Sequence, residues 1–143
     1  MVYRSNEIKK QVVENDPTEQ GERALLNFGH TIGHAIEKLC GFSLYHGECV
    51  GLGILAAAYL SQKQGNLTKE QLAGISQCLA AFGFQTQIGG ISPDAVLSAT
   101  KSDKKMVGSQ VKFILLHTIG DAYIYRELSD AQILDGIRYV CRA

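Results

Sequence analysis

The sequence predicts a mainly α-helical domain that carries one small β-hairpin near its C-terminus. Three observations support this class. Apolar residues recur at helical spacing through most of the chain, helix-starting signals precede several of these stretches, and only one pair of segments is typical of strands. With 143 residues, of which 45% are hydrophobic and 20% charged, the chain has the size of one domain and can bury a core. We therefore expect a single compact helical domain over residues 1–143.

Two helices are expected in the first part of the chain. An amphipathic helix is predicted over about residues 5–14, and Pro17 separates it from a long helix over about residues 19–40. Gly29 and Gly33 lie one turn apart inside this long helix, where each costs about 1 kcal/mol relative to Ala. We expect another backbone or a ligand to approach closely at these two glycines.

The later elements follow from turn and cap signals. Thr68 with Gln71, and Ser129 with Gln132, have the spacing of capping boxes, and a Ser-Pro pair at position 92 is typical of a helix start. In chain order we predict a helix over about 47–64 with His46 at or just before its N-terminus, helices from Thr68 to about Phe82 and from Ser92 onward, strands Val111–His117 and Ala122–Tyr125, and a helix from Ala131 to about Cys141.

Composition excludes several classes of function. Fourteen basic residues balance fourteen acidic ones, so no overall positive field favours nucleic acid or an anionic membrane as a partner. No signal peptide and no membrane-spanning stretch is predicted, and four cysteines without CxxC spacing favour buried, reduced thiols in the cytoplasm. No glycine-rich turn follows a strand and opens a helix, so we predict no nucleotide site in this chain.

Polar side chains gather in the long predicted helix. Arg23, Asn27, His30, His34 and Glu37 follow one another at steps of four and three, so on one helix they share a face. The other faces are apolar, which favours burial, and buried polar groups require partners. The spacing therefore predicts that this face borders a cavity that holds a ligand, a metal ion or both.

The histidines favour a metal. His30 and His34 lie one helical turn apart, which is a weak signal alone, and His46 at the start of the next helix strengthens it. Two imidazoles, a carboxylate and an open position describe a catalytic zinc site. Among nearby acidic residues, the sequence does not distinguish which would supply a carboxylate: Glu19, Glu37 or Glu48.

An anion is the alternative ligand for the same face. The guanidinium of Arg23 and the amide of Asn27 suit phosphate oxygens, and one of the histidines would join them. A metal ion and a phosphate sharing this face is a further interpretation. Lys104 and Lys105 either close on that anion or form a solvated basic turn, and Lys9 has the same two interpretations. We interpret His117, which lies among apolar residues of a predicted strand, as a structural or edge histidine.

These motifs together resemble the C-terminal domain of 3-dehydroquinate synthase, and the resemblance covers nearly the whole chain. The matching segments are Lys9-x-x-Val12-Val13-x-x-Asp16, Glu19-x-Gly21-x-Arg23-x-Leu25-Leu26-Asn27-Phe28-Gly29-His30-Thr31-x-Gly33-His34-Ala35-x-Glu37, His46-Gly47-Glu48-x-Val50, and Asp103-Lys104-Lys105 before the hairpin that ends in Ile119-Gly120.

The resemblance implies a set of roles. A Zn²⁺ or Co²⁺ ion would be held by His30 and His46, with the family's third ligand, a glutamate, outside this chain. The resemblance places substrate and phosphate binding on Lys9, Arg23, Asn27, His34, Lys104 and Lys105, and an acidic active-site residue at Glu19. Proton transfer falls either to His34 or to the departing phosphate.

The same resemblance implies a reaction and a context. Enzymes of this family convert 3-deoxy-D-arabino-heptulosonate 7-phosphate to 3-dehydroquinate and phosphate in the shikimate pathway. Bound NAD first oxidises a ring hydroxyl and later reduces the ketone. The N-terminal domain that binds NAD is not in this sequence. We therefore expect a fragment of a two-domain, homodimeric cytoplasmic enzyme, inactive alone.

Two other interpretations stay open at this point. A sister sugar-phosphate cyclase, such as a 2-deoxy-scyllo-inosose synthase, would use the same scaffold on another substrate. Alternatively, the chain is a non-catalytic helical module for dimerisation or metal binding, in which the glycines serve helix packing alone.

Overall fold

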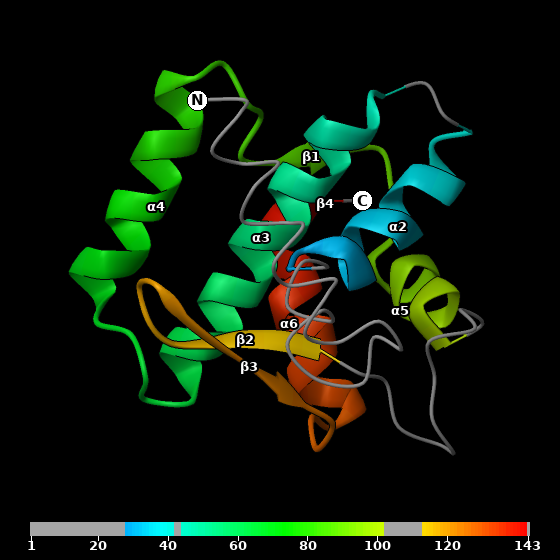
Figure 1. Ribbon diagram of the computed structural model, residues 1–143. Coiled ribbons are helices and arrows are strands. Elements are labelled where there is room, and N and C mark those ends of the chain that lie inside the picture. The colour runs from blue at the N-terminus through cyan, green and yellow to red at the C-terminus, as the bar shows by residue number, and fades with distance from the viewer. Residues whose placement is uncertain (1–27, 42–43, 102–112, 143) are drawn as a thin grey trace, which may run out of the picture.

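The computed structural model describes residues 28–41, 44–101 and 113–142, and it confirms a mainly helical domain with a small hairpin (Figure 1). The predicted helix over residues 5–14 lies outside the described residues. The elements are α2 (His30–Leu39), α3 (His46–Lys63), α4 (Lys69–Ala81), β1 (Ile88–Gly89), α5 (Pro93–Lys101), β2 (Phe113–Thr118), β3 (Asp121–Tyr125), α6 (Asp130–Val140) and β4 (Cys141–Arg142).

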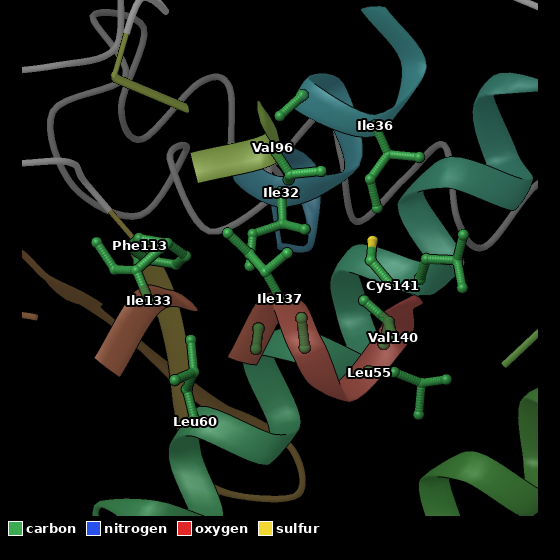
Figure 2. Close-up of a cluster of buried hydrophobic side chains, with 14 of the residues drawn as sticks. Ile32, Ile36, Leu55, Leu60, Val96, Phe113, Ile133, Ile137, Val140 and Cys141 are labelled. Carbon is green, nitrogen blue, oxygen red and sulfur yellow. The ribbon is translucent and has the colours of Figure 1, made fainter. Parts of the chain in front are cut away.

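Helix α3 forms the centre of the fold. It contacts α2, α4, α6 and β2, and most of its residues between Cys49 and Ser61 are buried. Such a helix has no solvated face, which explains why its sequence is apolar on nearly every side. Figure 2 shows the core where α2, α3, α5, β2 and α6 meet, and its labelled side chains are Ile32, Ile36, Leu55, Leu60, Val96, Phe113, Ile133, Ile137, Val140 and Cys141.

A buried serine fastens the hairpin to α3. The Ser61 hydroxyl donates to the Ala57 carbonyl oxygen at 2.8 Å and accepts from the Leu116 backbone N–H at 2.9 Å. Ser61 has no exposed surface, so the Ser61 hydroxyl and the Leu116 N–H each depend on the other as a hydrogen-bond partner. The bond fixes the position of β2 along α3.

Both predicted capping boxes are confirmed. At the start of α4 the Gln71 backbone N–H donates to the Thr68 hydroxyl at 3.1 Å, and the Gln71 side chain accepts from the Thr68 N–H at 2.9 Å. Ser129 and Gln132 make the same pair of bonds at the start of α6. These reciprocal bonds satisfy backbone donors that the first helical turn leaves open.

The predicted hairpin is confirmed within the described residues. β2 and β3 pair antiparallel, with Phe113 opposite Tyr125 and Leu115 opposite Tyr123, and positions 111–112 lie outside the described residues. The structure adds a second, parallel pair between β1 and β4, which sequence reasoning missed. Each of these strands has two residues, too few for an alternating pattern to be visible.

The prediction of one long helix over residues 19–40 is wrong at residues 28–29. α2 begins only at His30, and Gly29 has φ +81°, a left-handed conformation that an α-helix excludes. His30, His34 and Glu37 therefore share one helix, whereas Arg23 and Asn27 lie outside the described residues.

The cysteines are free thiols, but not all are buried as predicted. Cys49 and Cys141 are buried, Cys40 is half-buried and Cys78 is exposed. Cys78 lies on α4, whose only buried residue is Leu72, so most of that helix faces solvent. No helix in the described part of the chain is long and apolar enough to span a bilayer.

Candidate metal centre

The site is built where α2 crosses α3, and glycines set the distance between the two helices. A Cβ atom on Gly53 of α3 would overlap the carbonyl oxygen of Gly29 and lie 2.8 Å from the backbone N of Gly33. A Cβ on Gly33 would lie 2.9 Å from the Cys49 carbonyl oxygen. Backbone contacts of this kind leave no room for a side chain, so the predicted close approach at Gly29 and Gly33 is confirmed.

This close crossing brings three histidines together. His30 and His34 lie on α2, and His46 is the first residue of α3, as the sequence predicted. Their ring centroids lie 5.9 Å (His30 to His34), 5.3 Å (His30 to His46) and 5.8 Å (His34 to His46) apart. Three imidazoles that meet in a triangle at the end of a buried helix are a candidate site for a metal ion.

A carboxylate completes the group. Glu37 follows His34 by three residues on α2, and the Nδ1 atom of His46 lies 3.2 Å from its Oε2 and 3.3 Å from its Oε1. Ligand atoms of His34, Glu37 and His46 all lie within 4.8 Å of one another. In the described part of the chain, neither His30 nor Glu48 belongs to this group, although the ring of His30 lies beside the other two histidines and Glu48 lies in the first turn of α3.

The donor set fits a zinc or cobalt ion. Imidazole nitrogens and a carboxylate oxygen are the ligands of catalytic zinc sites, and cobalt accepts the same set. The sequence left three acidic residues open as a source of a carboxylate, and the fold brings Glu37 to the histidines. Glu19 lies outside the described residues, so the comparison is between Glu37 and Glu48. It depends on how α2 and α3 are aligned, which helical spacing alone does not reveal.

The remaining candidate residues lie outside the described residues, so their distances to the histidines stay predictions: Lys9, Glu19, Arg23, Asn27, Lys104 and Lys105. His117, interpreted from the sequence as a structural or edge histidine, lies exposed on β2, where its ring stacks on Tyr123 with centroids 3.9 Å apart. Nothing in this contact connects His117 to the three histidines.

Burial raises the pKa values of two cysteine thiols in this domain. Burial above all, and then the nearby Cys40, Glu37 and Glu48, raise the pKa of the Cys49 thiol to about 11. Burial, followed by Cys40, raises the pKa of Cys141 to about 11 as well. Both thiols therefore form the thiolate less readily than an ordinary cysteine does.

The fold and the site together define a class: a helical domain in which two closely packed, glycine-containing helices bring together three imidazoles and a carboxylate, a donor set that fits a divalent metal ion. Residues 1–106 match the family described as 3-dehydroquinate synthase C-terminal. The chain belongs to this family.

Curated relatives agree with this assignment. The 3-dehydroquinate synthase of Haemophilus ducreyi is 45% identical over 139 residues, which cover 96% of this chain and 38% of that protein. The 3-dehydroquinate synthase of Desulforamulus reducens is 40% identical over 129 residues, which cover 89% of this chain and 36% of that protein. The chain thus spans less than two fifths of the length of these relatives.

Solved structures confirm the fold class. A 2-deoxy-scyllo-inosose synthase complexed with carbaglucose-6-phosphate, NAD⁺ and Co²⁺ matches 91% of this chain and 38% of its own, with a TM-score of 0.80 at 23% identity. The 2-epi-5-epi-valiolone synthase of Streptomyces hygroscopicus with NAD⁺ and Zn²⁺ bound matches 90% of this chain and 36% of its own, with a TM-score of 0.76 at 20% identity. At these identities the likeness establishes the fold alone.

Proposed function

We propose that this chain is the metal- and phosphate-binding half of a 3-dehydroquinate synthase, a carbon–oxygen lyase. The proposed reaction converts 3-deoxy-D-arabino-heptulosonate 7-phosphate to 3-dehydroquinate and phosphate. The observation that carries this proposal is the meeting of His30, His34 and His46 at the crossing of α2 and α3. Its support from sequence is the 45% identity to a 3-dehydroquinate synthase.

The proposed roles divide the histidines. His30 and His46 hold a Zn²⁺ or Co²⁺ ion, with a further ligand supplied from outside this chain. When bound, the ion supplies Lewis-acid chemistry that polarises substrate oxygens. His34, whose ring lies within 6 Å of both other rings, binds the substrate and is placed to accept or return a proton.

The phosphate site in this proposal uses residues outside the described ranges. Arg23 and Asn27 bind phosphate oxygens through a guanidinium fork and an amide, and Lys9, Lys104 and Lys105 add positive charge. Glu19 is the acidic residue of the active site. Their shared task is to fix the substrate relative to the metal-binding histidines, which lowers the entropic part of the barrier.

NAD belongs to the portion of the relatives that this chain does not cover. We infer that redox chemistry depends on that portion, that the 143 residues alone are inactive, and that the complete enzyme is a cytoplasmic homodimer of the shikimate pathway. The chain would then contribute metal and substrate binding but no cofactor site.

A sister cyclase is the second candidate. It is favoured by the fold, because a 2-deoxy-scyllo-inosose synthase matches with a TM-score of 0.80. It is disfavoured by sequence, because that protein is 23% identical to this chain, whereas a 3-dehydroquinate synthase is 45% identical. A non-catalytic helical module would explain the glycine packing but leaves the histidine triangle without a role.

A chimera tests the proposal. The portion of the Haemophilus ducreyi enzyme that this chain does not cover is joined to residues 1–143, and the purified protein is given NAD⁺ and Zn²⁺ or Co²⁺. We expect 3-dehydroquinate from the heptulosonate phosphate and no product from glucose 6-phosphate, of which carbaglucose-6-phosphate is an analogue. Turnover of glucose 6-phosphate alone would establish the sister cyclase, and a folded, inactive chimera would favour the non-catalytic module.

A further inference from the structure

We propose that Glu37 is a positioning residue that holds the imidazole of His46 in the tautomer with the proton on Nδ1, which leaves the Nε2 lone pair free to bind a metal ion. The metal part of this inference rests on the proposed function, whereas the tautomer is a property of the metal-free chain. The observation behind it is the contact of one ring nitrogen, His46 Nδ1, with both carboxylate oxygens of Glu37 at 3.2 and 3.3 Å.

The chemistry of the two groups fixes the direction of this hydrogen bond. An ionised carboxylate only accepts, so Nδ1 of His46 must be the nitrogen that carries the proton. In a neutral imidazole the other nitrogen, Nε2, then has a free lone pair. A metal ion needs this lone pair, and a carboxylate behind a ligating histidine both orients the ring and increases its basicity.

The exposed fractions of the two side chains show which of them is held in a fixed position. The side chain of Glu37 is 14% exposed, whereas that of His46 is 52% exposed. Glu37 directly follows the fully buried Ile36 on a helix that the glycine crossing fixes against α3. The carboxylate is therefore the fixed group, and the exposed imidazole, which would otherwise sample several rotamers, is the group that it orients.

The helix end adds a favourable interaction. His46 is the first residue of α3, so the carboxylate bonded to its ring lies at the amino-terminal end of that helix. The partial positive charge at the amino-terminal end of a helix stabilises a negative group. This charge of the helix end adds to the hydrogen bond with His46 in favouring the position of the Glu37 carboxylate in the metal-free chain.

Direct coordination of the ion by Glu37 is the competing role, because its oxygen lies within 4.8 Å of ligand atoms of both His34 and His46. The nearly equal distances of its two oxygens from one nitrogen favour the hydrogen bond, in which the carboxylate faces the ring N–H. The two roles differ in what happens when the carboxylate is replaced by an amide, since the amide oxygen of Gln still accepts a hydrogen bond.

The first arm of the test needs no metal. Nitrogen-15 NMR of the 143-residue chain at about pH 9, where an ordinary imidazole is neutral, reports which ring nitrogen of His46 carries the proton. We expect the Nδ1–H form in the wild type and in Glu37→Gln, and a shift toward the Nε2–H form in Glu37→Ala. Glu70→Ala, which removes an exposed carboxylate from the first turn of α4, should match the wild type.

The second arm measures Co²⁺ affinity and the visible Co²⁺ spectrum of the chimera. We expect Glu37→Ala to weaken binding about 10- to 100-fold and Glu37→Gln to weaken it less, with the wild-type spectrum retained. An unchanged His46 tautomer in Glu37→Ala, or an unchanged Co²⁺ affinity, overturns the positioning role. A Co²⁺ spectrum that Glu37→Gln alters as strongly as His46→Ala does establishes direct coordination instead. If the wild-type chimera binds no Co²⁺, the proposed function fails, and the tautomer result alone decides whether Glu37 orients His46.

Discussion

The substitution Gly53→Ala tests whether the glycine crossing holds the site together. The added methyl group would overlap the Gly29 carbonyl oxygen and lie 2.8 Å from the Gly33 nitrogen. These neighbours are backbone atoms, which have no rotamer to move into, so α2 and α3 must separate. Overpacking of a core costs about 1–3 kcal/mol, and we take the upper end for a clash with backbone.

The helix itself favours the substitution, so the expected effect is a difference of two contributions. Replacing Gly by Ala inside a helix gains about 1 kcal/mol. A clash of about 3 kcal/mol then leaves a net loss of about 2 kcal/mol in the free energy of unfolding. Gly74→Ala is the matched control because it lies inside α4 with no atom within 4 Å of the added Cβ, so it should gain about 1 kcal/mol.

Urea unfolding followed by circular dichroism measures both variants. With a slope of about 2 kcal/mol per molar urea, the two variants should differ in their midpoints by about 1.5 M, with the wild type between them. Gly53→Ala should also weaken metal binding by the chimera, because His46 moves away from His30 and His34 when the helices separate. If Gly53→Ala is as stable as Gly74→Ala, the crossing does not have the contacts described here.

The remaining predictions concern the buried bond to the hairpin and the thiols. Ser61→Ala leaves the buried N–H of Leu116 without its acceptor, so we expect a loss of about 1–3 kcal/mol in urea unfolding; a loss below about 0.5 kcal/mol would contradict this. For the thiols, brief iodoacetamide treatment of the folded chain at about pH 8 should label exposed Cys78 first. Cys49 and Cys141 have pKa values of about 11, so at pH 8 only about one molecule in a thousand carries either thiol as a thiolate. Mass spectrometry that finds these two cysteines labelled as fast as Cys78 would refute their burial.

Much of the helical framework follows from local signals in the sequence. Thr68 and Ser129 with their partners three residues on fix two helix starts, because capping boxes involve only neighbouring residues. Gly29 and Gly33 also indicated a close contact with another backbone or a ligand. Their partner Gly53 was not predicted, because a partner on another helix depends on how the two helices cross.

The sequence was misleading where tertiary contacts override local spacing. Residues 28–29 fit a helical pattern, but Gly29 is left-handed and α2 begins only at His30. The same limit applies to the carboxylate. Glu37 and Glu48 are both near His46 in sequence, and only the alignment of α2 against α3 brings the Glu37 carboxylate against the His46 ring.

The most direct test of the central claim is the recovery of dehydroquinate formation by the chimera after its metal has been removed with a chelator. Zn²⁺ or Co²⁺ is added back to the wild-type chimera and to its His46→Ala variant, with NAD⁺ and the heptulosonate phosphate present. We predict that the wild type regains activity and that His46→Ala does not. Full activity of the chelated protein without added metal, or full recovery by His46→Ala, would contradict the account.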